Sequence, residues 1–213
     1  MRLKPTDALA MLLPPVLTRP LGWSWRVLSD QVSRLRIRGH DKLHLACGRN
    51  RIPGWANADL EGPPAVIKLD LTRPLPVDSG TMAFVYSEHF IEHIPHDAAA
   101  RLLRECHRVL KPGGVLRVST PSLAKLIDEY HAGRVDYWAD MNWRPASPAA
   151  LLNEGLSLWG HRFVYDATEL EAQLRAAGFS RVEPRGWRES PHPALANLEC
   201  RPFHGELIYD CTK

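Results

Sequence analysis

A short apolar run that stops at a glycine is the feature that most constrains how this chain can fold. The run from Leu43 to Ala46 is too short for a helix, and Cys47 and Gly48 follow it, so it predicts a buried strand that ends in a tight turn. A second short segment ends in the acid Asp59. In a doubly wound sheet, such a turn and such an acid lie where a nucleoside-bearing cofactor binds. The stretch predicts a nucleotide site, although an ordinary strand and loop with an incidental aspartate explains these residues alone equally well.

The glycine content of the turn narrows the kind of nucleoside. A dinucleotide site uses three glycines in the pattern GxGxxG, so that the backbone can approach a pyrophosphate at a helix N-terminus. Residues 46–51 have the sequence ACGRNR, with a single glycine, so a pyrophosphate-bearing cofactor is not expected. S-Adenosylmethionine has adenine, a ribose and a sulfonium but no phosphate. It requires one tight turn and an acid for the ribose hydroxyls, which this stretch can supply.

Length and composition predict a single domain with an elaboration. The chain has 213 residues, and 45% of them are hydrophobic, which is enough apolar material for a full core. The net charge of +3 is small, and the only dense basic run lies within residues 34–42. We interpret this run as a solvated face and expect no nucleic-acid partner. A phosphate-bearing partner or an anionic lipid surface is the alternative.

Cysteine usage favours a reducing compartment. The four cysteines form no CxxC pair, and three of them fall in segments that have the character of buried elements. This pattern argues against a disulfide scaffold or a zinc ribbon, and it predicts a cytoplasmic protein. The cysteines are Cys47, Cys106, Cys200 and Cys211.

Residues 1–40 are expected to form an extension ahead of the main domain, which covers residues 41–213. The apolar stretch at residues 8–17 is interrupted by a Pro-Pro pair, so it lacks the character of a signal segment and is too short to span a bilayer. Residues 24–37 predict an amphipathic helix that packs on the sheet or closes over the site, with a membrane-surface role as the alternative. Its apolar face consists of Trp25, Leu28, Val32 and Leu35.

Strand and helix patterns alternate beyond residue 60. Residues 65–71 and 82–86 are apolar runs of strand character. The spacing of apolar residues predicts a helix over 97–110, which Asp97 can cap and the following Pro-Gly-Gly ends. A further strand is predicted at 115–119. Short connections between such elements are typical of parallel βαβ units.

The segment 132–165 does not fit the sheet pattern and is predicted to be a partly irregular cap. Insertions of this kind at the carboxyl end of a sheet usually select the substrate. Its aromatic residues can stack on a sugar or another flat acceptor, or they can simply bury one another. They are Tyr137, Trp138, Trp143, Trp159, Phe163 and Tyr165.

Signals for the last elements follow the cap. Asp166 and Glu169 form a capping-box pattern at the start of a helix that ends near Gly178. Residues 181–184 and 206–211 are expected to supply the last two strands.

Four motifs together carry a family resemblance. The segments LHLACGRNRIPGWANAD, KLDLTRPLP, FVYSEHFIEHI and LLRECHRVLKPGGVLRVSTPSL follow one another between Leu43 and about Leu126. The likeness resumes at GHRFVYDATELEAQLRAAGF, which begins in the last part of the cap. In this order they resemble class I S-adenosylmethionine-dependent methyltransferases of the small bacterial type-11-like branch. The resemblance covers more than half of the chain. It implies a doubly wound, mostly parallel seven-stranded sheet of Rossmann-like type, with the last strand antiparallel.

The resemblance also implies roles for individual residues. The turn at residues 46–48 would lie under the methionine part of the cofactor, the acid ending the second strand would hold the ribose, and Asp70 with Leu71 would contact adenine. The family usually has glycine where this chain has Ala46, and alanine is strained there if the position needs a positive φ. S-Adenosylhomocysteine would be the product. The implied cofactor-binding residues are Ala46, Cys47, Gly48, Asp59, Leu60, Asp70, Leu71, Ser87 and Glu88.

The sequence HFIEH at residues 89–93 also matches the HxxEH signature of inverted zinc proteases. On a helix, His89 and His93 would lie on one face as metal ligands do. Two grounds argue against zinc: Pro95 ends such a helix too early, and no third ligand stands at a recognisable spacing. We therefore expect no metal. A neutral imidazole can instead deprotonate an acceptor hydroxyl, or these histidines can merely pack a short helix.

The predicted activity is methyl transfer from S-adenosylmethionine to a hydroxyl or amine of a small molecule or glycan precursor. The candidate bases are His89, His93 and His161, with His89 preferred because the resemblance puts the methyl end of the cofactor just past the fourth strand. A non-catalytic relative of the fold that binds a nucleoside or a partner protein is the alternative, and Ala46 is the residue that favours it. A zinc hydrolase is a third, disfavoured possibility.

Overall fold

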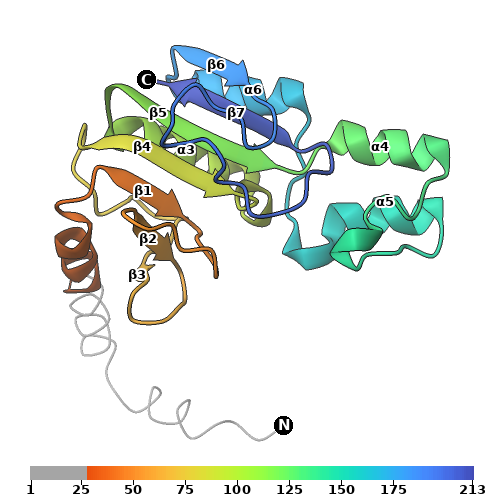
Figure 1. Cartoon of the computed structure of the whole chain (residues 1–213), viewed down its shortest axis with the longest axis horizontal. Coiled ribbons are helices and arrows are strands. Elements are labelled where there is room, and N and C mark those ends of the chain that lie inside the picture. The colour runs from red at the N-terminus through yellow and green to blue at the C-terminus, as the bar shows by residue number, and fades with distance from the viewer. Residues whose placement is uncertain (1–27) are drawn as a thin grey trace, which may run out of the picture.

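A seven-stranded sheet organises residues 28–213, which are the part of the chain that the computed structural model describes (Figure 1). The strand order is β3-β2-β1-β4-β5-β7-β6, and β7 alone runs antiparallel to its neighbours β5 and β6. This order confirms the predicted Rossmann-like class. The strands are β1 (Lys42–Leu45), β2 (Ala56–Asp59), β3 (Ile67–Lys68), β4 (Met82–Glu88), β5 (Leu110–Thr120), β6 (Arg181–Pro184) and β7 (Leu207–Thr212).

Helices connect the strands and build the cap. A helix at residues 28–37 precedes β1, and no helix within the described residues is long and apolar enough to cross a bilayer. The further helices are α3 (His96–Val109), α4 (Leu123–Ala132), α5 (Pro148–Ser157) and α6 (Ala167–Ala176). Three short 3₁₀ turns accompany them, namely η1 (Ile91–His93), η2 (Ala139–Met141) and η3 (Leu158–Gly160).

The main core lies between the sheet and the helices α3 and α6. Apolar side chains recur at three- and four-residue spacing along α3, so one face of this helix is buried, and Leu102 and Leu103 are almost fully covered. They pack on strand residues such as Leu43 and Val85, which are also fully buried. The chain between β6 and β7 crosses the face of the sheet, where a smaller cluster contains Leu195 (Figure 1).

Two predicted elements differ from the structure at their ends. The strand expected at 65–71 shrinks to Ile67–Lys68, because the chain turns away after pairing with the end of β2. The helix expected at 97–110 begins one residue earlier, with Pro95 at the N-cap position. Asp97 therefore does not cap the helix but lies inside it, where it pairs with Arg101 one turn on. The predicted Pro-Gly-Gly stop lies inside β5, where a register shift accommodates it.

The N-terminal helix packs with the face opposite to the predicted one. Leu28, Val32 and Leu35 are 53%, 55% and 63% exposed, so this apolar stripe faces solvent. Ser33 and Ile37 are buried instead, and the Ser33 hydroxyl donates to the carbonyl of Lys68. The helix therefore lies beside β3 and does not pack its apolar stripe on the sheet. Trp25 and the stretch 8–17 lie outside the described residues.

The cap is more regular than the sequence indicates. Ser147 caps α5, with Pro148 at its first position, and α5 lies against α4 beside the sheet rather than on one of its faces (Figure 1). Gly155 permits this approach, because an added Cβ would stand 2.6 Å from Leu126 Cδ2. The cap thus has its own apolar cluster, made of Leu126, Trp138, Trp143, Leu151 and Val164.

Half of the predicted capping box forms at the start of α6. The Asp166 side chain accepts a hydrogen bond of 2.8 Å from the Glu169 amide. The Glu169 carboxylate turns away from the box and contacts His96 Nε2 at 2.6 Å. The final strand is antiparallel, as predicted, and it covers Leu207–Thr212.

Candidate functional site

The turn after β1 has a positive φ at Ala46, the conformation in which alanine is strained. Ala46 has a φ of 52° and Gly48 a φ of 50°, so both lie in the left-handed region. A non-glycine residue there costs roughly 1–2 kcal/mol. The Cys47 amide donates to the carbonyl of Ala58, and the Gly48 amide donates to Asp59 Oδ2 at 2.8 Å. The turn and the acid of β2 are therefore joined directly.

The other predicted cofactor residues follow at the same edge of the sheet. Leu60 is exposed after β2, whereas Leu71 is buried. Asp70 lies in the turn after β3, where its Oδ1 accepts hydrogen bonds from the Thr72 amide and hydroxyl at 3.0 and 2.6 Å. Parallel strands bring these side chains together because their carboxyl ends share one edge. Their contacts with the cofactor stay a prediction.

The end of β4 is tied to the C-terminal loop. The Glu88 carboxylate accepts hydrogen bonds from the amides of Cys200 and Arg201 at 3.1 and 3.3 Å. Ser87 is buried beside it, and its hydroxyl has no hydrogen-bond partner among the described residues. Glu88 thus anchors a distant loop, a role that the sequence did not indicate.

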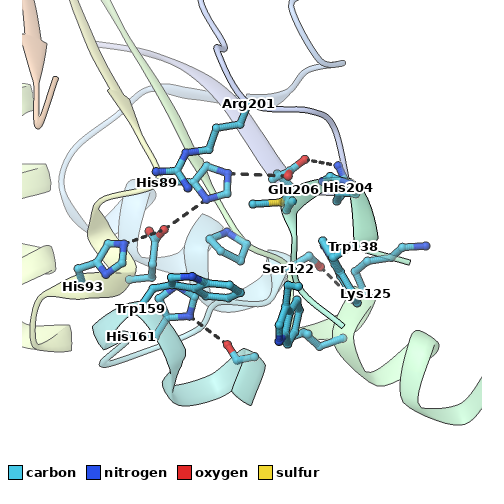
Figure 2. Close-up of a pocket in the computed structure, with 16 residues that line it drawn as sticks. His89, His93, Ser122, Lys125, Trp138, Trp159, His161, Arg201, His204 and Glu206 are labelled. Atoms are coloured by element: carbon cyan, nitrogen blue, oxygen red, sulfur yellow. Dashed lines mark hydrogen bonds and ion pairs between the residues drawn. The ribbon is translucent and has the colours of Figure 1, made fainter. Parts of the chain in front are cut away.

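A cavity of about 190 Å³ opens just past β4, between the sheet, the cap and the C-terminal loop (Figure 2). The three predicted bases His89, His93 and His161 all line it, although they come from different segments. None of the nine predicted cofactor residues does. The other polar lining residues are Glu92, Ser122, Lys125, Arg201, His204 and Glu206, and the aromatic ones are Trp138, Trp143 and Trp159.

His89 does not share a helix face with His93, contrary to the zinc-protease pattern. Its φ of 50° breaks the chain between β4 and η1, and its amide donates to the carbonyl of Ser119. The imidazole lies between two carboxylates, with Nδ1 3.5 Å from Glu92 Oε1 and Nε2 3.8 Å from Glu206 Oε1 (Figure 2). Burial, followed by the charge of Arg201, lowers the pKa of His89 to about 3. The ring is therefore neutral at ordinary pH.

Glu92 is the buried acid at the bottom of this cluster. Its Oε2 accepts a hydrogen bond of 3.0 Å from the Thr120 hydroxyl, while its Oε1 has no hydrogen-bond partner among the described residues. Burial raises the pKa of Glu92 to about 7. Oε1 also lies 3.7 Å from Nε2 of His93. In the sequence, Glu92 stood out only as part of the disfavoured zinc-protease signature.

His161 enters the cluster from the cap. Its Nδ1 donates to the carbonyl of Gly155 at 3.0 Å, and its ring centroid is 5.0 Å from that of His93. The amides of Arg162 and Phe163 donate to the carbonyl of Glu92 at 2.6 and 3.2 Å, which fixes the cap chain against η1. A third potential metal ligand therefore stands next to Glu92 and His93. The sequence did not indicate this neighbour, because spacing along the chain does not reveal it.

The sequence also missed the residues that the C-terminal loop brings to the cavity. Arg201, His204 and Glu206 lie between β6 and β7, where the sequence showed no motif. Glu206 was expected to begin the last strand, but it lies just before β7, which starts at Leu207. Their position depends on the buried Arg117, which bonds Glu199 Oε1 at 2.5 Å and Asp210 Oδ1 at 2.9 Å.

Comparisons with known proteins agree with this architecture. A family model described as a methyltransferase domain matches residues 39–183. An S-adenosylmethionine-dependent methyltransferase from Archaeoglobus fulgidus is 15% identical with a TM-score of 0.52, over 88% of this chain and 94% of that one. One from Mesorhizobium loti is 19% identical with a TM-score of 0.50, over 86% and 96%. At such identities these structures establish the fold alone. No curated protein sequence matches the chain.

Proposed function

The chain belongs to the methyltransferase domain family as a class I enzyme that uses S-adenosylmethionine, and we propose that it methylates a hydroxyl of a ring-shaped small molecule or glycan precursor. The observation that carries this proposal is the cavity past β4, which combines tryptophan rings with buried polar groups. An amine acceptor is the alternative.

The position of the cavity supports the proposal. In the class I arrangement the cofactor lies over the carboxyl ends of the first strands, with its methyl group near the end of β4. The cavity begins at His89, directly after Glu88 ends that strand. An acceptor held there would stand in line with the sulfonium, and such alignment can supply several kcal/mol of the barrier.

The aromatic wall supports a flat or ring-shaped acceptor. Trp143 and Trp159 meet edge to face with their ring centroids 5.1 Å apart. Trp159 has a φ of 59° and is 50% exposed, so a strained backbone displays a large apolar ring at the cavity. Strain of this kind tends to be kept where function requires it. Tryptophan faces bind the apolar faces of rings, while the polar groups of the cavity can bind hydroxyls.

His89 remains our candidate for the proton acceptor, although burial makes it a weak base. As the methyl group bonds to the acceptor oxygen, that oxygen gains positive charge and its proton becomes strongly acidic. A neutral imidazole with a pKa of about 3 can still accept such a proton. Its hydrogen bond to the hydroxyl would also orient the oxygen toward the methyl group.

Radiolabelled S-adenosylmethionine with a panel of sugars, phenols and amines tests the proposal. We expect transfer to a hydroxyl compound.

His89→Ala should lower kcat by at least about tenfold while leaving cofactor affinity nearly unchanged, because the interaction is made in the transition state. Nuclear magnetic resonance should find the His89 ring neutral between pH 5 and pH 8, given its lowered pKa.

The exposed His131 on α4 provides a matched control, and His131→Ala should leave turnover unchanged. Full turnover in His89→Ala together with its loss in His161→Ala would move the base to the cap. If both variants turn over normally on the true acceptor, the enzyme works by alignment alone. Transfer to amines but to no hydroxyl compound would refute the proposed acceptor class.

A further inference from the structure

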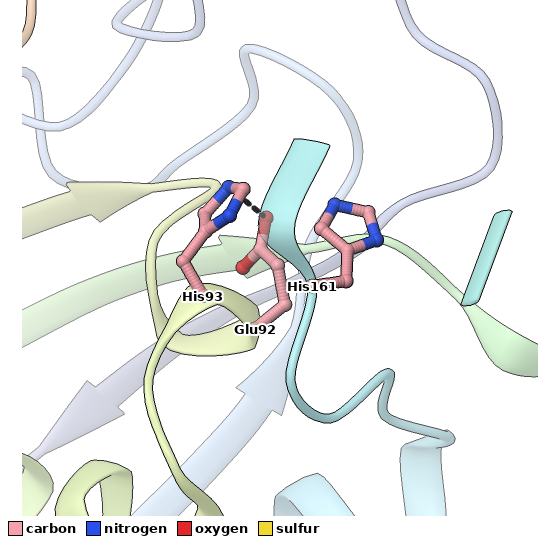
Figure 3. A group of neighbouring side chains, drawn as sticks. All are labelled: Glu92, His93 and His161. Atoms are coloured by element: carbon pink, nitrogen blue, oxygen red, sulfur yellow. Dashed lines mark ion pairs between the residues drawn. The ribbon is translucent and has the colours of Figure 1, made fainter. Parts of the chain in front are cut away.

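Three side chains at the cavity have the composition and spacing of a metal site. Glu92, His93 and His161 each offer one ligand atom, and these atoms lie within 4.8 Å of one another (Figure 3). We propose that they bind a divalent transition-metal ion, and that zinc is the ion which best fits two imidazoles and one carboxylate. The ligands come from η1 and from the chain after η3, so the ion would fasten the cap to the end of the sheet.

The distance between two of the ligand atoms suits a shared ion better than a direct hydrogen bond. His93 Nε2 is 3.7 Å from Glu92 Oε1, which is too long for a hydrogen bond. Two ligands of a tetrahedral zinc ion, each about 2.0–2.1 Å from the metal, stand about 3.4 Å apart. Small side-chain rotations would therefore bring this pair to ligand spacing.

Glu92 supplies an independent sign of a ligand. The carboxylate is fully buried, and its Oε1 has no hydrogen-bond partner among the described residues. Such an oxygen is costly to bury, and a bound cation would remove that cost. The Thr120 hydroxyl holds Oε2 at 3.0 Å and so orients the carboxylate, as outer partners of metal-binding carboxylates do.

His161 is prepared for the same role. Because a carbonyl can only accept, the bond to Gly155 puts the proton on Nδ1 and leaves the lone pair on Nε2. Figure 3 shows a ring nitrogen of His161 on the side that faces Glu92. A histidine that binds a metal through one nitrogen commonly donates its other N–H to a carbonyl. The bonds from Arg162 and Phe163 to the Glu92 carbonyl keep the two segments in place.

Three protein ligands leave a coordination position for a molecule in the cavity. An acceptor hydroxyl bound to the ion would lose its proton more readily, because a metal lowers the pKa of a bound oxygen. This use of the ion rests on the proposed function. Binding of the ion does not, so it can be measured without methyl donor or acceptor.

The test is calorimetric titration of zinc into the full-length protein after chelator treatment, with cobalt absorption as a second readout. We expect about one ion per chain and cobalt bands in the visible region typical of tetrahedral sites. His93→Ala and His161→Ala should each weaken binding by at least about tenfold. His204→Ala is the matched control, because His204 lines the same cavity but is outside the cluster.

Thermal unfolding separates loss of the site from loss of the fold. Zinc should raise the Tm of the wild-type protein and of His204→Ala, and it should raise the Tm of neither ligand variant. If an alanine variant does not fold, His93→Gln or His161→Gln replaces it at the same position. The proposal is overturned if the wild-type protein binds no zinc, or if the ligand variants bind it as tightly as the wild type does.

Discussion

The two halves of the site are built in different ways. The half assigned to the cofactor consists mainly of turns at the ends of β1, β2 and β3 in residues 45–71, to which the end of β4 adds Ser87 and Glu88. The polar contacts among these turns lie within a short stretch of sequence, such as the bond between the Gly48 amide and Asp59. The acceptor half consists of side chains from η1, α4, the cap and the C-terminal loop, which are far apart in the sequence.

Because of this difference, we expect the two halves to respond differently to amino-acid substitutions. A turn depends on the conformation of a few neighbouring residues, whereas the cavity depends on contacts that hold distant segments together. Arg117 is the clearest such contact, because it lies fully buried in β5 and bonds Glu199 in the loop and Asp210 in β7. Damage to this contact should affect the acceptor half, while damage to the turn should affect the cofactor half.

Arg117→Met should have the largest effect. It leaves the buried Glu199 without its guanidinium partner, while Asp210 keeps Arg185 and Ser190. Loss of one member of a buried ion pair costs about 3–5 kcal/mol. The free energy of unfolding from urea titration measures this effect. Arg101→Met is the control, because the pair of Arg101 and Asp97 is exposed to solvent and contributes little to stability. Equal stability of the two variants would show that the network does not anchor the loop.

Asp59→Ala should have an intermediate effect, confined to the cofactor half. Losing a hydrogen bond from the ribose to a carboxylate should weaken S-adenosylmethionine binding by about 1.5–3 kcal/mol. Calorimetry measures the affinity, and Glu61→Ala, two residues along, is the control. NAD should not bind, because the turn has one glycine. Tight NAD binding, or unchanged affinity in Asp59→Ala, would break the assignment of this half.

Ala46→Gly should have the smallest effect. Glycine relieves the left-handed strain of about 1–2 kcal/mol, but it adds flexibility to the unfolded chain that offsets about 0.5–1 kcal/mol. We therefore expect a gain in stability of about 1 kcal/mol or less, with cofactor affinity equal or slightly higher. Ala98→Gly, in the first turns of α3, is the control and should destabilise the protein. A loss of stability in Ala46→Gly would mean that the alanine methyl group contributes packing that outweighs the strain.

The strands and the turn of the cofactor half could be predicted from the sequence, while the contacts of its residues with the cofactor stay a prediction. Short apolar runs broken by Gly48 and ended by Asp59 report strand, turn and strand locally, and the structure has them at those places. The error was at a boundary, in the shortened β3, where pairing with β2 covers only Ile67 and Lys68.

The acceptor half could be predicted only in part. Aromatic content marked the cap, and HxxEH marked His89 and His93, but the pattern gave a wrong helical geometry because His89 adopts a positive φ. The N-terminal helix shows the same limit, since periodicity found its apolar stripe but not which face would be buried.

By itself, the sequence determined the class of fold, the turn after β1, the acid that ends β2 and the acid after β3, because these depend on residues close to each other in the chain. Only the tertiary structure decided that Glu92, His93 and His161 meet, that Glu88 anchors the C-terminal loop, and that His89 lies between two carboxylates. Burial and partners set the properties of these groups, and both arise when distant segments pack together.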